Sequence, residues 1–107
     1  MLIQINSDNS TAVTASAIEG MTAALETALA RFEDRLTRVE VHLAEETAPH
    51  ASGRMVKCTI EARPRGQEPL AIIAHAPDVV AALREGTHKA IAALDTRFGK
   101  TSDRKGH

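Results

Sequence analysis

Aromatic side chains are almost missing from this chain of 107 residues, which has no tryptophan or tyrosine and only two phenylalanines, Phe32 and Phe98. The core must therefore be aliphatic. Some RNA-binding sheets recognise single strands by stacking bases on strand aromatics, and this composition practically excludes that mode of binding.

Cysteine is scarce as well, because Cys58 is the only one. An intramolecular disulfide is excluded, and a reducing compartment is favoured. The first residues lack the basic segment and the apolar stretch of a secretory signal, and no apolar run is long enough to cross a membrane. We therefore expect a cytoplasmic protein with no membrane partner.

Motifs for catalysis are also missing. The sequence has no glycine-rich phosphate loop, no nucleophile elbow, no pair of histidines at helical i, i+4 spacing and no Cys-x-x-Cys. Two carboxylate pairs, Glu33-Asp34 and Glu45-Glu46, lie at predicted element ends, where solvated charge explains them better than acid–base catalysis. We expect no enzyme activity, no metal, no cofactor and no small-molecule substrate.

The composition is that of an ordinary globular protein, with 43% hydrophobic and 25% charged residues. The length suits one domain. The net charge of −1 conceals an asymmetry, since residues 1–53 carry −5 and residues 54–107 carry +4. A basic second half favours a polyanionic partner.

A predicted β-hairpin organises the middle of the chain. Apolar and polar residues alternate over residues 54–63, which predicts a strand with one buried and one solvated face and puts Cys58 on the buried side as a small hydrophobe. Residues 64–69 contain two prolines and a glycine and predict a turn. Residues 70–75 return as a second strand.

The remaining segments complete the domain. Strands are predicted at 2–6 and 38–44, an amphipathic helix at about 15–33 capped by Thr14 or Ser16, and a second helix that begins at Asp78 and stops at Gly99. Ser16 and Glu19 also fit a capping box. We expect a single domain over residues 1–99 and a flexible polar tail over 100–107. The expected buried stripe of the second helix is Val80, Leu83, Thr87, Ile91, Leu94 and Phe98.

The order β-α-β-β-β-α predicts an α+β fold with a four-stranded mixed sheet and both helices packed on one face, because only one face of each strand is apolar. The first two strands, joined through a helix, can be parallel, and strands two to four form a meander. The other face should be solvated. Its residues are Gln4, Arg38, Glu40, His42, Lys57, Thr59, Glu61 and Arg63.

The order of elements and several segments resemble the short ribosome hibernation factors, also called ribosome-associated inhibitor A or sigma-54 modulation proteins. The likeness covers nearly the whole chain and is carried by residues 1–6, 30–32, 35–43 and 58–63 and by the segment Leu94-Asp95-Thr96-Arg97-Phe98-Gly99-Lys100. It implies a cytoplasmic stress-response protein that binds rRNA of the small ribosomal subunit in the channel used by mRNA and tRNA, and so blocks translation. Longer members add a dimerisation domain, which we expect this protein to lack.

Phosphate binding is the chemistry that the cations favour. The candidate rRNA contacts are Arg84, Lys89, Arg97 and Lys100 along the second helix and its end, with Arg63 and Arg65 at the hairpin tip. Cations near a helix C-terminus also complement the helix dipole, which is an alternative explanation for part of the pattern.

An alternative function follows from the charge of the first helix, where acidic residues outnumber the two cations, Arg31 and Arg35. A domain of the same fold without rRNA binding would use its polar sheet face or a strand edge to bind a protein, or a second copy of itself as a weak homodimer.

Overall fold

The protein is described here from a computed structural model, which describes residues 1–8, 13–46 and 55–106, with side chains as far as residue 99. The observed order is β1 (Leu2–Ser7), α1 (Ala15–Ala28), a short 3₁₀ helix η1 (Ala30–Phe32), β2 (Leu36–Glu46), β3 (Met55–Pro64), β4 (Leu70–Ala76) and α2 (Val79–Gly106). This is the predicted β-α-β-β-β-α order of an α+β fold.

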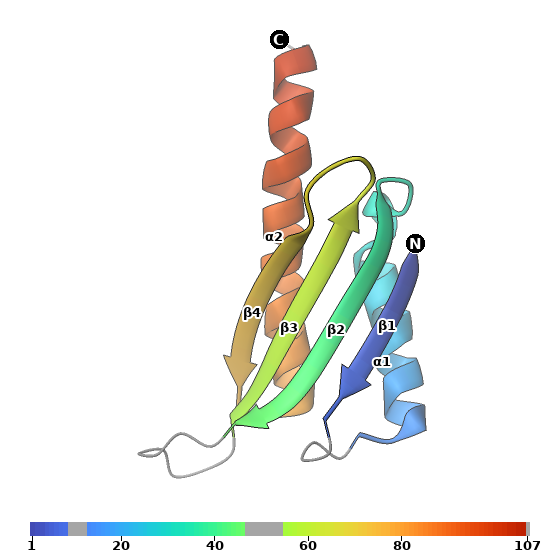
Figure 1. Cartoon of the computed structure of the whole chain (residues 1–107), viewed down its shortest axis with the longest axis vertical. Coiled ribbons are helices and arrows are strands. Elements are labelled where there is room, and N and C mark those ends of the chain that lie inside the picture. The colour runs from blue at the N-terminus through green and yellow to red at the C-terminus, as the bar shows by residue number, and fades with distance from the viewer. Residues whose placement is uncertain (9–12, 47–54, 107) are drawn as a thin grey trace.

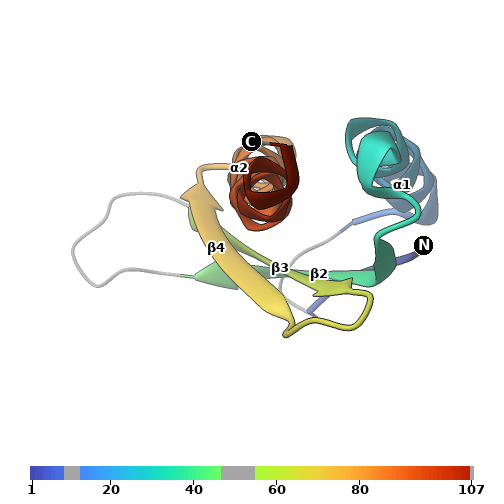
Figure 2. The same ribbon diagram turned by 90° about the horizontal axis from the view of Figure 1, so that it is seen from above.

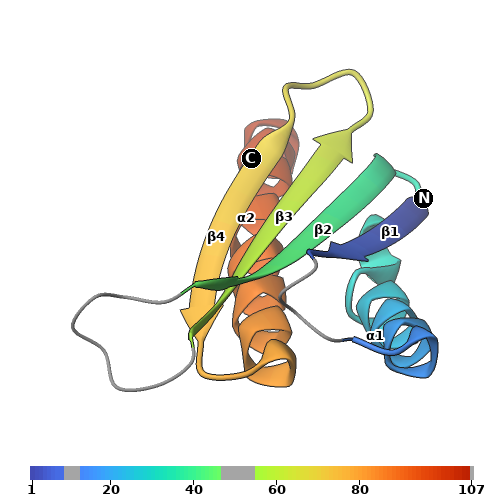
Figure 3. The ribbon, with the colours of Figure 1, turned by 60° about the horizontal axis from the view of Figure 1, so that its bottom comes forward.

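The four strands form one sheet in the order β1-β2-β3-β4. The β1 and β2 strands are parallel, with Ile5 beside Val41, whereas β2–β3 and β3–β4 are antiparallel. Both helices lie on the same face of this mixed sheet, side by side, as the view from above shows (Figure 2), and the tilted view shows the same arrangement (Figure 3). Figure 1 shows the other face, which no element covers.

The core lies between the sheet and the helices. Alternate residues of each strand point into it, among them Val39, Val41, Cys58 and Ile60, all at most 1% exposed. The aromatic pair sits at one end of the core, with the ring centroids of Phe32 and Phe98 5.8 Å apart. The opposite face carries the eight predicted polar residues, which are exposed or half-buried, and the two-faced pattern of the strands is confirmed.

Two helix starts follow from capping side chains. Thr14 Oγ1 accepts a hydrogen bond from the backbone N–H of Ala17 at 3.0 Å, so Thr14 is the N-cap of α1 and Ser16 lies inside the helix. The predicted capping box at Ser16 is therefore wrong. Asp78 Oδ1 accepts from the N–H of Ala81 at 2.8 Å, as predicted for the start of α2.

The helix ends differ from the prediction. After Ala28 the chain tightens into η1, so α1 is shorter than the periodicity indicates. The α2 helix continues through Gly99 to Gly106 instead of stopping there. A C′ glycine ends a helix by adopting positive φ, and among the described residues only Gly66, in the β3–β4 turn, has one, at 74°. The division into a domain and a flexible tail at residue 100 stays a prediction.

The buried side of α2 also differs. Val80 is 60% exposed, and Thr87 and Ile91 are half-buried. The residues that meet the sheet are small, with Ala82, Gly86 and Ala90 spaced four apart. The predicted stripe consists mainly of large apolar residues, but the closest approach of a helix to a sheet favours the smallest ones. The large residues flank that line and face either the core or α1.

Candidate nucleic-acid interface

The six predicted cations do not form one continuous patch on α2. Arg84 lines a groove between α1 and α2, whereas the ammonium of Lys89 donates a hydrogen bond to the backbone carbonyl of Ile73 in β4, at 3.2 Å. Five residues on a helix amount to a rotation of about 140° beyond a full turn. The two side chains therefore lie on opposite sides of α2.

The other candidates gather at one end of the molecule, where the β3–β4 turn meets the later part of α2 (Figure 1). Arg97 Nη1 donates to the backbone carbonyl of Glu68 at 2.9 Å and lies 3.4 Å from Gln67 Oε1, which attaches α2 to the turn. Arg65 is exposed in that turn, and Arg63 lies on the open face just before it. Lys100 follows in α2 at the same end, but its side chain lies outside the described residues.

Two further arginines belong to this end and were not among the predicted contacts. The guanidinium of Arg31 lies 4.5 Å from the ring centroid of Phe32, and that of Arg35 lies 4.1 Å from the ring centroid of Phe98. Cation–π stacking orients a guanidinium and leaves its N–H groups available. The signal for Arg31 in the sequence is the Arg-Phe dipeptide 31–32, which recurs at 97–98, whereas the stacking of Arg35 on Phe98 depends on how the two segments pack.

Backbone contacts bring these segments together. The N–H of Arg65 donates to the carbonyl of Arg35 at 2.9 Å, so the turn after β3 touches the segment before β2. Together with the attachment of Arg97 to the turn, this places five arginines around one end of the fold. We call this set the arginine end: Arg31, Arg35, Arg63, Arg65 and Arg97.

Carboxylates neutralise part of the arginine end. Arg31 and Asp95 form an exposed pair with contacts of 2.6 and 2.7 Å, and its hydrogen bond lowers the pKa of Asp95 and raises the pKa of Arg31. Arg63 lies 3.4 Å from Glu61. Within the described part of the chain, Arg35 and Arg65 have no such carboxylate partner, so their charge is available to an anion.

The open face of the sheet is electrically compensated. Register places Glu40 opposite Glu61 and Arg38 opposite Arg63, and each arginine is close to a glutamate on its own strand. Arg38 Nε, for example, lies 2.9 Å from Glu40. A polyanion would meet no uniform positive surface there.

Cys58 and the potential metal ligands do not form a site in the described segments. Cys58 is fully buried, and burial raises the pKa of its thiol to about 11, so it is protonated and inert at neutral pH. Over residues 1–8, 13–46 and 55–106, no three His, Cys, Asp or Glu side chains are grouped so as to hold a metal ion. None of the helices in the described segments has the length and apolarity needed to span a membrane.

Comparison with known proteins finds matches to the structure but none to the sequence. No protein-family model and no curated protein matches the sequence. The structure is similar to the N-terminal domain of Protein Y from Thermus thermophilus, with a TM-score of 0.67 and 17% identity over 92% of this chain and 99% of that one. It is also similar to a ribosomal subunit interface protein from Coxiella burnetii, with a TM-score of 0.64 and 14% identity over 96% of this chain and 99% of that one. The chain therefore has the fold of these two proteins over nearly its whole length, and the resemblance to the hibernation factors is confirmed at the level of the fold.

Proposed function

We propose that this protein binds the small ribosomal subunit through rRNA phosphates and occludes the channel used by mRNA and tRNA. The observation that carries the proposal is the match of nearly the entire chain to the fold of a ribosomal subunit interface protein, with both chains covered almost completely. The similarity in fold extends over 96% of this chain and 99% of that one, which supports a similar mode of binding.

The arginine end supports a phosphate-binding role. Arg35 and Arg65 offer guanidinium groups that no carboxylate among the described residues neutralises, and guanidinium binds phosphate oxygens in a bidentate manner. Arg97 lies on α2 at this same end, where it contacts the β3–β4 turn, and Lys100 follows it in the helix. Lys89 would first have to release the carbonyl of Ile73. The rRNA contacts are therefore centred on the arginine end, and Arg84 and Lys89 contribute less.

The test is co-sedimentation of the purified protein with 30S subunits at low ionic strength. The wild-type protein is expected to pellet saturably with the subunits. The double variant Arg35→Gln/Arg65→Gln is expected to bind at least about tenfold more weakly, because two phosphate contacts are lost. Arg38→Gln is the matched control, since Arg38 lies on the open face beside Glu40, and it should bind within twofold of wild type.

Occlusion is tested separately, by displacement of a labelled mRNA or tRNA from the same subunits. Protein that stays at the top of the gradient at low salt contradicts the proposal altogether. Protein that pellets but displaces neither RNA contradicts only the occlusion.

A second candidate function is favoured by the exposed apolar residues of the open face. Leu2 on β1 is 54% exposed and Ile73 on β4 is 48% exposed, and α1 carries Glu19 and Glu26 without any cation. A protein-interaction module of the same fold, or a weak homodimer, would bury these residues. Saturable binding to 30S subunits that weakens steeply with salt rejects this candidate.

A further inference from the structure

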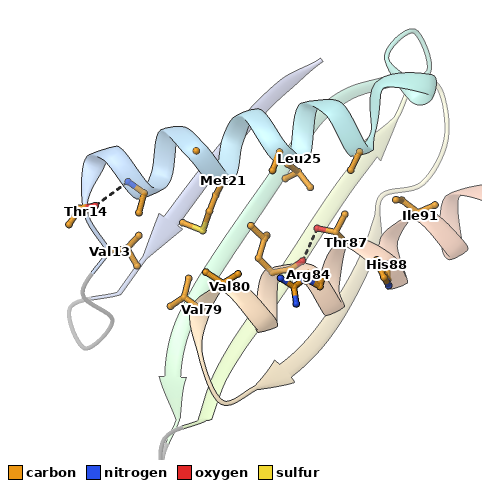
Figure 4. A pocket seen from close by; sticks show the side chains of 15 residues that line it. Val13, Thr14, Met21, Leu25, Val79, Val80, Arg84, Thr87, His88 and Ile91 are labelled. Carbon is orange, nitrogen blue, oxygen red and sulfur yellow. Dashed lines mark hydrogen bonds between the residues drawn. The ribbon is translucent and has the colours of Figure 1, made fainter.

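An apolar groove runs between the two helices on the outer side of the helix layer. Its volume is about 710 Å³. Figure 4 shows the side chains of α1, including Met21 and Leu25, pointing toward those of α2 across it. The α1 wall is made largely of very small residues, with Ala17, Gly20 and Ala24 in a line. Because these side chains are small, they leave the space between the two helices unfilled and the groove open.

The lining has an unusual chemical balance. It contains no aromatic residue and no carboxylate. The hydroxyl of Thr87 donates to the carbonyl of Leu83 at 2.7 Å, and that of Thr14, the N-cap of α1, accepts from the N–H of Ala17, so both are engaged by their own helices. The remaining polar groups are the side chains of Arg84 and His88, one turn apart on α2.

Arg84 gives the groove a positive charge that no described residue neutralises. Its side chain is exposed, and no hydrogen bond or ion pair holds it within the described residues. His88 is exposed beside it and can donate a further hydrogen bond. An aliphatic wall with a single cationic group at its rim is complementary to a ligand with one anionic head and an aliphatic body. A nucleobase would find no aromatic face for stacking, and a polyanion would find only one arginine.

The dimensions suit a chain-like ligand. The lining on α1 extends from Thr14 to Ala28, a length of about 21 Å for a helix. The groove is therefore long enough for an extended alkyl chain, and the small residues of its α1 wall leave room for one.

We propose that the groove binds an aliphatic monocarboxylate, a fatty acid, with its carboxylate on Arg84 and His88 and its alkyl chain along Ala17, Gly20 and Ala24. The volume lies within the range of small-molecule sites, about 300–1,000 Å³. Each methylene that leaves water adds to the affinity, so longer chains bind more tightly until the groove is filled. This site is separate from the arginine end and does not depend on the proposed ribosome binding.

The experiment titrates the full chain with laurate below its micelle concentration, followed by calorimetry and by amide NMR shifts. Saturable binding is expected, with shifts that map to both walls of the groove. Dodecyltrimethylammonium has the same tail with the opposite charge and should bind at least tenfold more weakly. Decanoate should bind more weakly than laurate.

Two pairs of variants identify the site. A Cβ added at Gly20 meets nothing within 4 Å, so there is room for a side chain at this position, and Gly20→Leu is expected to occupy the groove and abolish laurate binding. Ala23→Leu adds the same side chain to α1 outside the lining and should bind like wild type. Arg84→Gln is expected to weaken laurate at least tenfold without changing the weak binding of the cationic amphiphile, with Arg38→Gln as its control.

Three results would overturn the proposal. The first is the absence of saturable laurate binding. The second is equal binding by wild type and Gly20→Leu, which would place the ligand elsewhere. The third is a concentration-dependent dimer that Gly20→Leu converts to a monomer and that laurate leaves unchanged, which would make a second copy the occupant. Circular dichroism of each variant separates these outcomes from a failure to fold.

Discussion

Gly86 lies where α2 comes closest to the sheet. A Cβ built at this position would lie 3.1 Å from both Cys58 Sγ and Ile60 Cδ1, two atoms of fully packed core residues on β3. Such distances are shorter than ordinary van der Waals contacts. The missing side chain therefore sets the distance between the helix and the sheet.

Substitution of Gly86 tests this contact directly. Gly86→Leu is expected to lower the free energy of unfolding by about 2 kcal/mol, because the larger side chain overpacks the core. Gly20→Leu is the matched control on α1, and it should raise that free energy by up to about 1 kcal/mol, because helix propensity improves in open space. Urea unfolding followed by circular dichroism measures both. Equal effects of the two variants would show that α2 does not depend on the small residue.

Single residues also show where reasoning from sequence stops. Arg84 and Lys89 are close in sequence and share a charge, yet the helix directs one toward α1 and the other toward β4. Arg35 and Arg65 are far apart in sequence and meet through one backbone hydrogen bond. Linear spacing describes neighbours on a strand or helix well, but it cannot describe contacts that depend on the packing of several elements.

At the scale of elements, the alternation of apolar residues was enough to locate all four strands, their two faces and the hairpin turn. The reason is physical: a half-buried strand must alternate, and its turn requires residues such as Gly66 with positive φ. Helix ends were predicted less well. Gly99 has strong stop character in isolation, but a glycine inside a helix costs only about 1 kcal/mol, which continuation of the helix can offset.

The two candidate caps of α1 give a test at this scale. Thr14→Ala is expected to lower the free energy of unfolding by about 1 kcal/mol, because the N–H of Ala17 loses its acceptor. Ser16→Ala, two residues further along the chain, serves as the control and should change the free energy of unfolding by less than about 0.5 kcal/mol. Thermal and urea unfolding of the two variants side by side provides the measurement. A larger effect at Ser16 would contradict the assigned cap.

At the scale of the whole molecule, the charge asymmetry between the two halves of the sequence is redistributed by folding. β2 belongs to the acidic half and β3 to the basic half, but each strand places an arginine beside a glutamate on the open face, so neither half keeps its net charge there. The arginine end draws on both halves, with Arg31 and Arg35 from the acidic half and Arg63, Arg65 and Arg97 from the basic half. The topology of the fold decides where the positive charge lies, and a count of charges along the sequence does not show this.

The salt dependence of ribosome binding should reflect the charge at the arginine end. A plot of the logarithm of the binding constant for 30S subunits against the logarithm of the KCl concentration is expected to be linear and to fall. Each phosphate contact contributes about 0.7–0.9 to the slope, so Arg35→Gln/Arg65→Gln should reduce its magnitude by about 1.5. Arg38→Gln should leave it unchanged. Parallel lines for wild type and the double variant would place the phosphate contacts elsewhere.

The hydrogen bond from Lys89 to the carbonyl of Ile73 has a consequence for solubility. β4 is the last strand on its side of the sheet, and a bare outer strand invites extended peptides to align with it and start amyloid-like growth. The ammonium of Lys89 occupies a backbone carbonyl that an added strand would need as a hydrogen-bond acceptor. It also brings a hydrated charge to this edge of the sheet. Lys89, which the sequence suggested as a contact to rRNA, thus helps to prevent another molecule from adding a fifth strand to the sheet.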